Sequence, residues 1–498
     1  MFNKNKSNKY VVILIFLFIT LGLIIRLIKF RQQPFYDWDE ALYGQVAREM
    51  LVNKTLNTTF NSNPWLDKPP LSYLMISVVF SIFNENEAVA RSLFAIFAIA
   101  LLFLIYLLTK KIIRAFYKKS DDINLIIIPI LITSASKLFI DKATTLNTDI
   151  IISVSILGYF AFYKNKLIKT LFLILGVWTK SVIGFFPLII EPFLIIKSSK
   201  NMRSFINKTL FLLFQLGIAC LWYFYAYLQY GDYFIKAHFY SQIYKRIILP
   251  IELHFGDKWF YFKVLGIDLS WLILAIILGL MILIKNLVLD LYKNRVLILK
   301  SDRFILYIVL LSPLLLLFIY TIVKTKLDWY LIYIIPIISI YPIFLLSNLK
   351  SYIRKIAIFL IIGYSIFKFS TNTYVVKPQI NIDEKIILAK CLNQKNIDKL
   401  SFLADEEQRT IKNVLEAAKL QTESSFLYSG SPSFVFYLNK PIQTYYSTQE
   451  FVKNYKNSSS FVISKQDYEN LLNSLDTDSF QTICQTENWI GFKKIYYK

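Results

Sequence analysis

Long apolar runs set the strongest constraint on how this chain can fold. Segments such as VVILIFLFITLGLIIRLI and LLLLFIYTIV carry at most one charged residue each. About 20 apolar residues in a helix span the roughly 30 Å hydrocarbon core of a bilayer. The runs do not alternate apolar and polar residues, as the strands of a membrane β-barrel do. Since 56% of all residues are hydrophobic, the sequence predicts a polytopic membrane protein with an all-α membrane domain.

The positions of the charges explain the formal net charge of +23. Such a charge suits a nucleic-acid binder, but many lysines and arginines lie in short gaps between apolar runs, where the positive-inside rule places cytoplasmic cations. We therefore expect no nucleic-acid partner. The basic gaps lie at 4–9, 110–119, 164–169, 197–203, 285–303 and 350–355.

Placing these gaps in the cytoplasm predicts eleven to thirteen transmembrane helices, a cytoplasmic N-terminus and an external C-terminus. The first run is too long for a typical signal peptide and no small-residue cleavage site follows it, so we expect a retained helix. Residues 70–83 are apolar but too short to span, so we expect them to lie flat on the outer face. The predicted spans are 10–30, 88–108, 123–139, 148–163, 168–179, 182–196, 206–228, 264–284, 303–323, 328–346 and 355–371.

The chain changes character after residue 371, where apolar runs shorten and charged and turn residues appear. We predict a membrane domain at 1–371, with a first outer loop at 31–87, and a soluble α/β domain at 372–498 outside the membrane. Cys391 and Cys484 lie in this last region and are able to pair, although nothing in the sequence requires it. The three cysteines of the chain have no metal-site spacing.

The predicted outer loops collect the ionisable residues that the positive-inside rule does not explain. Because such residues are costly at a membrane, a functional role is the default hypothesis. For Asp37 we favour a helix cap. Asp39 and Glu40 are adjacent, and two carboxylates are more than a helix cap needs, so we favour a functional role for this pair. Lys68 is held in place by Pro69 and Pro70. It is equally well explained as a site residue or as a snorkelling lysine. The loops carry Asp37, Asp39, Glu40, Arg48, Asp67, Lys68, Asp149, Lys180, His238, His254, Lys324, Lys326, Asp328 and Tyr330.

Cations beside carboxylates at the edge of a hydrophobic compartment suit a substrate that is a lipid-linked phosphate. Lysine and arginine neutralise the phosphate as it leaves, and an aspartate orients or deprotonates the acceptor. The low local dielectric constant strengthens both effects relative to water. No nucleotide is needed, so the sequence needs no glycine-rich phosphate loop.

Six motifs occur in an order that resembles the bacterial C-type (GT-C) glycosyltransferases. They are DWDEALYGQVAREM, LDKPPLSYLM, AVARSLFAI, TLNTDIIISVSIL, WTKSVIGFFPLII and TKLDWYLIYIIPI. The nearest group is that of the aminoarabinose-type lipid A transferases, which are related to protein O-mannosyltransferases. The resemblance covers residues 10–350 and implies a GT-C membrane domain with an outward-facing site and interfacial helices in the first loop.

The resemblance also implies roles for individual residues. Asp39 matches the catalytic aspartate, with Glu40 beside it, and Asp149 matches the acidic residue of the second outer loop. The implied donor-phosphate residues are Lys68, Lys180, Lys326, Tyr330 and Arg48.

A metal site is a secondary implication of the same resemblance. Some aminoarabinose-type enzymes bind zinc through a carboxylate just before the loop lysine and a histidine of a later outer loop. Asp67 and His238 take these positions, and both residue types suit zinc. The expected reaction requires no cofactor.

The implied activity is transfer of a single sugar from a polyprenyl (undecaprenyl) phosphate donor to a cell-envelope acceptor, with inversion. The foremost acceptor is lipid A, in lipopolysaccharide biosynthesis at the periplasmic face of the bacterial inner membrane. The nearest alternative is a protein O-glycosyltransferase or an oligosaccharide-transferring relative. A transporter or flippase is more distant, because transporters usually show repeats and charges at mid-bilayer and no repeat is visible here.

Overall fold

The computed structural model describes residues 4–117, 122–300, 302–377, 382–395, 397–425, 431–476 and 479–495. Parts of the predicted basic gaps, at 118–119 and 301, lie outside these ranges, as do residues 378–381 of the predicted C-terminal domain. The chain forms two compact units. Unit 1 comprises Met1–Lys29, Ala88–Gly231 and Phe255–Pro378, and unit 2 comprises Phe30–Glu87, Asp232–His254 and Gln379–Lys498. The predicted domain boundary at residue 371 stays a prediction.

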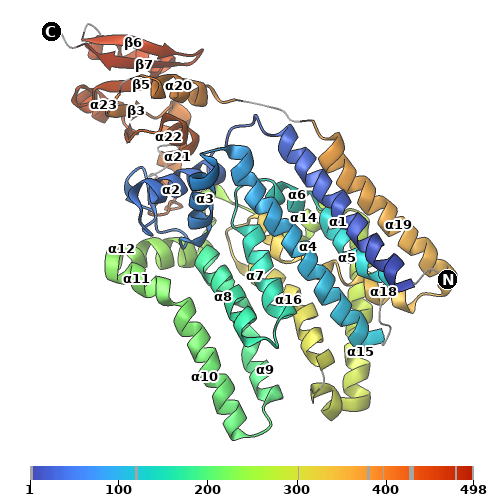
Figure 1. The fold of residues 1–498 in the computed structure, drawn as a ribbon. Coiled ribbons are helices and arrows are strands. Elements are labelled where there is room, and N and C mark those ends of the chain that lie inside the picture. The colour runs from blue at the N-terminus through green and yellow to red at the C-terminus, as the bar shows by residue number, and fades with distance from the viewer. Residues whose placement is uncertain are drawn as a thin grey trace. The chain divides into compact units, whose positions relative to one another are not determined.

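Unit 1 is a bundle of helices without strands in the described residues. Its long helices α1, α4, α10, α15, α16 and α19 are drawn in Figure 1. The bounds are α1 Lys4–Lys29, α4 Glu87–Tyr117, α5 Ile123–Ala135, α6 Lys137–Ala143, α7 Asp149–Ala161, α8 Lys166–Lys180, η1 Ser181–Ile189, α9 Glu191–Ser198, α10 Met202–Ala219, α11 Leu221–Tyr230, α14 Phe260–Leu269, α15 Leu272–Lys300, α16 Asp302–Ile322, η4 Asp328–Tyr333, α17 Ile335–Ile338, α18 Pro342–Asn348, α19 Ser351–Ser370 and η5 Thr371–Val375.

Within the described residues, six helical stretches are long and apolar enough to cross a membrane, or seven if the bent pair α5–α6 counts as one span. The remaining predicted spans fall on shorter or more charged helices. The helix α7 has 13 residues, all buried, and α19 carries Arg354, Lys355 and Lys368. The fold class, a helical membrane domain with many crossings, is confirmed, whereas the predicted number of eleven to thirteen exceeds what length and composition alone support.

The stretch from Lys166 to Ile196 is apolar enough for one span, but the backbone reverses direction inside it. Ser181 has a φ of 59°, and a Cβ on Gly184 would lie 2.3 Å from the backbone nitrogen of Val177. Residues seven apart in a straight helix are about 10 Å apart. Helices α8 and η1 therefore lie side by side, which agrees with the separate spans predicted at 168–179 and 182–196. Lys180 is the last residue before the reversal.

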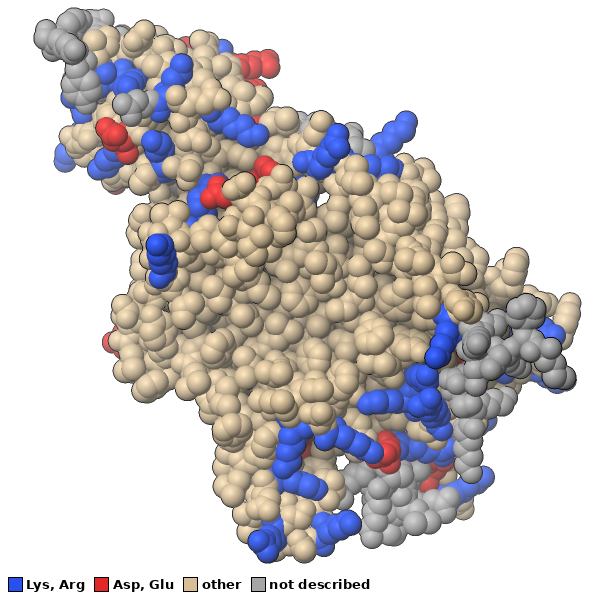
Figure 2. Space-filling view, viewed as in Figure 1, with Lys and Arg blue, Asp and Glu red and all other residues tan. Residues whose placement is uncertain are grey.

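Contacts among the basic gaps place several of them at one end of unit 1. Lys164 pairs with Asp302 at 2.6 Å. Arg303 donates to the carbonyls at the end of α4, and Arg354 pairs with Asp122. Figure 2 shows Lys and Arg side chains gathered where the α9–α10 turn lies, below a broad face with few charges. This segregation is what the positive-inside pattern predicts; which side of the membrane this end faces stays a prediction.

Unit 2 combines the first outer loop, the segment 232–254 and the C-terminal region. Its helix α3 buries Tyr73, Ile76 and Phe80 and exposes Val78, Ile82 and Phe83, so one apolar side is left uncovered, as expected for an interfacial helix. The bounds are α2 Asp39–Asn53, β1 Thr59–Phe60, β2 Asn63–Pro64, α3 Leu71–Phe83, α12 Asp232–Phe234, η2 Ile235–Lys245, α13 Arg246–Ile248, η3 Ile251–Leu253, α20 Glu384–Asn393, β3 Leu400–Leu403, α21 Glu406–Ala417, α22 Pro432–Leu438, β4 Ile442–Tyr445, α23 Thr448–Asn454, η6 Tyr455–Asn457, β5 Ser460–Ser464, α24 Lys465–Leu471, η7 Leu472–Ser474, β6 Phe480–Gln485 and β7 Trp489–Lys494.

A five-stranded mixed sheet organises the C-terminal region, with strand order β4-β3-β5-β7-β6. Strand β3 runs parallel to β4 and β5, with Leu400 opposite Ile442 and Ser460. Strand β7 runs antiparallel to β5 and β6. All four residues of β3 are buried, as expected for an interior strand covered on both faces. The predicted α/β character is confirmed.

A disulfide joins Cys391 on α20 to Cys484 on β6, across 93 residues of sequence. It decides the pairing that the sequence left open. Such a bond restricts the unfolded chain. In the chain-entropy model, closing a loop of this length adds roughly 4 to 5 kcal/mol to the free energy of unfolding. Disulfides persist in oxidising compartments.

Replacing both cysteines with serine should therefore lower the stability of the C-terminal region by about 2–5 kcal/mol. Proteolysis of the purified full-length protein at increasing urea concentration measures this effect. Cys220, which is outside the disulfide, offers the matched control Cys220→Ser. Equal proteolysis profiles for the double variant and the control would contradict a stabilising disulfide.

Candidate functional site

The predicted catalytic aspartate lies beside the predicted phosphate-binding lysine of the first loop. The Nζ atom of Lys68 is 3.9 Å from Oδ1 of Asp39. Lys68 also donates to the hydroxyl of Tyr43, and its Nζ lies 4.5 Å from the centre of that ring. The Asp39 side chain is 44% exposed and that of Lys68 24% exposed. Both groups are thus accessible to a substrate, and Tyr43 fixes the lysine next to the carboxylate.

The local sequence explains this arrangement. Asp39 is the first residue of α2, and Tyr43 lies one turn later on the same face. Trp38, just before the helix, has a φ of 66°, which is uncommon for an aromatic residue and costs about 1–3 kcal/mol. On the other side, Pro69 and Pro70 end the loop directly before α3 begins. Rigid backbone therefore holds both partners.

The carboxylates on either side of Asp39 make structural contacts. Glu40 is buried and accepts a hydrogen bond from the backbone of Tyr36. Asp37 accepts from the backbone of Ser433 at 2.7 Å and from the Ser431 hydroxyl, and burial raises the pKa of the Asp37 carboxyl. Asp37 is therefore a helix cap, as favoured from the sequence, although it caps α22 rather than α2. The catalytic role of Glu40 stays a prediction.

Arg48 has partners other than the expected phosphate site. Its guanidinium makes two hydrogen bonds with Glu85, at 2.8 and 2.6 Å. It also stacks 3.7 Å from the centre of the Phe436 ring and is buried. Bidentate pairing and stacking are what a guanidinium does when it holds a structure together. Arg48 thus joins the first loop to the C-terminal region within unit 2.

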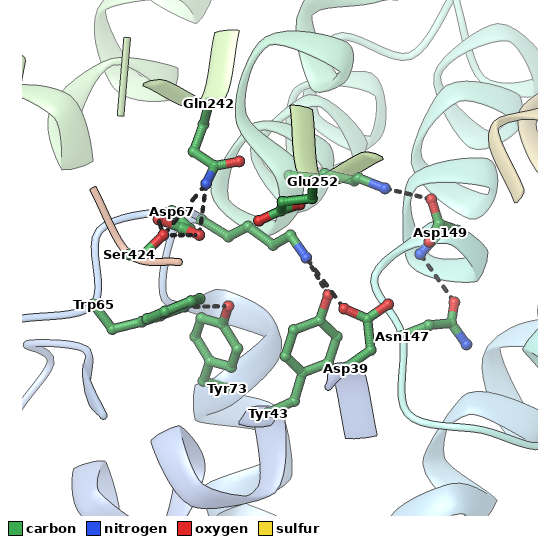
Figure 3. Close-up of polar contacts among 12 residues, drawn as sticks. Asp39, Tyr43, Trp65, Asp67, Tyr73, Asn147, Asp149, Gln242, Glu252 and Ser424 are labelled. Carbon is green, nitrogen blue, oxygen red and sulfur yellow. Dashed lines mark hydrogen bonds and ion pairs between the residues drawn. The ribbon is translucent and has the colours of Figure 1, made fainter. Parts of the chain in front are cut away.

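Asp67, next to Lys68, connects three segments of unit 2. Its carboxylate accepts hydrogen bonds from the Ser424 hydroxyl and from Nε2 of Gln242, all at 2.7 Å. Figure 3 shows Gln242 and Ser424 converging on Asp67. Burial raises the pKa of the Asp67 carboxyl to about 6. The residue before Lys68 is therefore anchored to the segment 232–254 and to the C-terminal region.

The second predicted metal ligand, His238, is buried on η2. Its Nδ1 donates to the carbonyl oxygen of Leu66 at 2.8 Å, and burial lowers the pKa of the imidazole to about 4. A neutral ring oriented in this way is compatible with metal binding. However, the described residues contain no group of three or more His, Cys, Asp or Glu side chains able to hold a metal, and both Asp67 oxygens already accept hydrogen bonds. The donor set does not fit a zinc site.

A second polar cluster lies in unit 1, where α7 begins and α8 ends. Lys180 Nζ is 2.5 Å from Oδ1 of Asp149 and 2.9 Å from the hydroxyl of Tyr333. The Tyr333 hydroxyl donates to the same carboxylate oxygen. The amide oxygen of Asn147 accepts from the backbone of Asp149 and so caps α7 (Figure 3). Three residues from distant segments thus form one triad, in which Asp149 and Tyr333 are buried and Lys180 is partly buried.

Two other predicted phosphate-binding residues, Tyr330 and Lys326, differ in their contacts. The ring of Tyr330 lies over Lys180, at 5.3 Å from its Nζ, and 4.9 Å from the ring of Tyr320. Lys326 instead donates to the carbonyl oxygens of Tyr320 and Thr321 at 2.7 and 2.8 Å. These carbonyls belong to the last turn of α16, so the lysine caps the C-terminal end of that helix. Burial lowers the pKa of the Lys326 ammonium. Tyr330 belongs to the Lys180 cluster, and Lys326 is a helix cap.

Sequence reasoning missed several members of these clusters. Tyr43 carried a usable signal, because it falls one helical turn after Asp39. Tyr333 carried a weaker one, three residues after Tyr330. Ser424 and Gln242 carried no signal, because they lie 357 and 175 residues away from Asp67 along the sequence.

No protein-family model matches the chain. A protein of Aquifex aeolicus (strain VF5), described as uncharacterized, is 27% identical over 248 residues. The match spans about half of either chain, 47% of this one and 46% of the relative.

Solved structures give a stronger similarity, in fold. ArnT from Cupriavidus metallidurans, solved bound to undecaprenyl phosphate, is 12% identical with a TM-score of 0.68, over 98% of both chains. The archaeal oligosaccharyltransferase AglB from Archaeoglobus fulgidus, in complex with an inhibitory peptide and a dolichol-phosphate, is 11% identical with a TM-score of 0.55, over 94% of this chain and 71% of AglB. At such low identity the likeness concerns the fold alone. The chain therefore has the fold of ArnT, as the sequence resemblance implies, over 98% of its length.

Proposed function

We propose that this protein is an inverting glycosyltransferase that moves one sugar from a polyprenyl phosphate to a cell-envelope acceptor. The observation that carries the proposal is the accessible pair of Asp39 and Lys68, 3.9 Å apart, in a chain of the GT-C fold. ArnT, which this chain resembles, was solved with undecaprenyl phosphate, and this supports a donor of that class. Lipid A is the acceptor we favour, as the sequence resemblance implies.

In the proposed reaction an acceptor oxygen forms a bond to the anomeric carbon of the sugar. The bond from that carbon to the phosphate oxygen breaks, and the electron pair leaves with the polyprenyl phosphate. Lys68 stabilises the negative charge that develops on the leaving phosphate. If the acceptor is a hydroxyl, Asp39 takes its proton; if it is a phosphate, the oxygen is already ionised and Asp39 positions it.

The other predicted site residues take separate roles in this proposal. Lys180, held by Asp149 and Tyr333, stays a proposed phosphate-binding cation, and Tyr330 packs over it. We assign structural roles to Glu40, Arg48 and Lys326, because Glu40 accepts from the backbone of Tyr36, Arg48 pairs with Glu85 and Lys326 donates to the carbonyls at the end of α16. We propose no metal requirement, because Asp67 is committed to Ser424 and Gln242.

We propose a location in the bacterial inner membrane, with the N-terminus in the cytoplasm and unit 2 in the periplasm. The contacts among the basic gaps support a common side for them. The disulfide between Cys391 and Cys484 supports an oxidising surrounding for the C-terminal region.

Replacing Asp39 with asparagine should lower the rate of sugar transfer by about 10²–10⁴-fold, since the variant can neither accept a proton nor carry the charge. The assay uses the purified full-length protein in vesicles with a polyprenyl-phosphate sugar and an envelope lipid fraction. Asp476, in an exposed ion pair with Lys456, offers the matched control Asp476→Asn. Near-normal turnover of the Asp39 variant would remove this residue from the proposed mechanism.

Replacing Lys68 with methionine should reduce transfer by about 100-fold or more, because the departing phosphate loses its counter-charge. Lys68→Arg keeps the charge, so its transfer rate should lie between those of the unchanged protein and of Lys68→Met. Tyr43→Phe removes the hydroxyl that accepts from the lysine but keeps the ring beside it, and should lower the transfer rate about tenfold or less. Lys456→Met is the control for the loss of a positive charge. A Lys68→Met variant as active as this control would refute the proposed role.

Treatment with a divalent-metal chelator should leave transfer unchanged, since the described residues supply no third ligand beside Asp67 and His238. Elemental analysis should find less than one zinc per chain. Stoichiometric zinc that disappears in Asp67→Ala, together with activity that zinc restores after chelation, would show instead that the site holds a metal.

A further inference from the structure

The segment 232–254 has two faces of different chemistry. It forms α12, the wide helix η2 with hydrogen bonds from i to i+5, and α13. In such a helix, residues four or five positions apart share a face. One face, which carries Phe234, Ala237, His238 and Ser241, is buried. The opposite face presents large apolar side chains at the same spacing: Ile235, Phe239, Tyr240, Tyr244 and Ile248. We call these five residues the aromatic stripe.

The aromatic stripe is exposed although its residues are apolar. The exposed fractions are 41% for Ile235, 49% for Tyr240 and 51% for Tyr244. The rings of Tyr240 and Tyr244 stack at 5.6 Å, which makes a continuous surface. Contiguous exposed apolar surface of this kind usually marks a contact with another molecule or with a membrane.

Chain connectivity identifies what covers the stripe. The candidate span Met202–Tyr230 ends two residues before Asp232, so the segment starts at the edge of the bilayer. Two residues of extended chain reach only about 7 Å. Tyrosine and other aromatic residues are enriched at the membrane–water interface. Exposed Lys236, beside the stripe, suits the anionic lipid headgroups there.

We propose that the segment 232–254 is an interfacial helix that seats unit 2 on the outer leaflet of the membrane, with the aromatic stripe in the headgroup region. Its other face holds the loop that carries Lys68. His238 donates to the carbonyl of Leu66 and Gln242 donates to Asp67. The membrane surface thereby fixes the depth of the Lys68 ammonium, which matches the level of a lipid-linked phosphate; this last step rests on the proposed function.

Depth measurements with spin labels test the proposal. In a Cys220→Ser background, the variants Tyr244→Cys and Tyr240→Cys receive a nitroxide label without reduction of the disulfide. The full-length protein is placed in bilayers of phosphatidylethanolamine and phosphatidylglycerol. Leu17→Cys, on the exposed face of the candidate span Lys9–Lys29, gives the lipid reference, and Glu469→Cys, exposed on α24, gives the water reference.

For the labels at 240 and 244, we expect a high ratio of collisions with oxygen to collisions with a water-soluble nickel complex. This ratio should be several-fold higher than for the label at 469. A ratio like that at 469 would place the stripe in water and overturn the proposal. Poor access to both reagents would show that a protein surface covers the stripe, which also overturns it. The outcome does not depend on catalysis: lipid-buried labels together with an active Lys68→Met variant would refute the proposed function and leave the interfacial helix standing.

Discussion

The structure depends on the rule that a charge removed from water must find a partner. Two unit charges at 4 Å interact far more strongly at the protein's effective dielectric constant than in water, and an unpaired buried charge is correspondingly costly. Unit 1 satisfies the rule with Lys180, Asp149 and Tyr333, and again with Lys169, Glu191 and Tyr159. Both groups contain a cation, a carboxylate and a tyrosine hydroxyl from different helices. Each therefore orients its helices as well as its charges.

The same rule explains the accessible pair in unit 2. Lys68 and Asp39 lie 3.9 Å apart, whereas Arg48 and Glu85 are in direct contact at 2.6 Å. An accessible cation beside an accessible carboxylate is what a leaving phosphate and its acceptor need. The surrounding contacts are structural: Asp37 caps α22, Asp67 holds Ser424 and Gln242, and rigid prolines follow the lysine.

The sequence predicted what local patterns determine. Apolar runs and basic gaps were sufficient for the helical membrane domain, and the change of composition after residue 371 was sufficient for the α/β region. It did not predict which partners each charge finds, because Arg48 with Glu85 and Asp67 with Ser424 depend on chain segments brought together by folding. Lys326 as a cap of α16 was partly foreseeable, since a lysine just after a helix favours the terminal carbonyls. The length of α7 was not, because a buried short helix is as apolar as a spanning one.

The central claim is that a single sugar moves from a lipid phosphate to an envelope acceptor. Mass spectrometry of lipid A and envelope glycans, from cells with and without this gene, tests it most directly. The account predicts that one sugar residue disappears from an envelope lipid in the deletion strain and returns with the intact gene. Unchanged envelope lipids, with whole oligosaccharides lost from proteins instead, would contradict it.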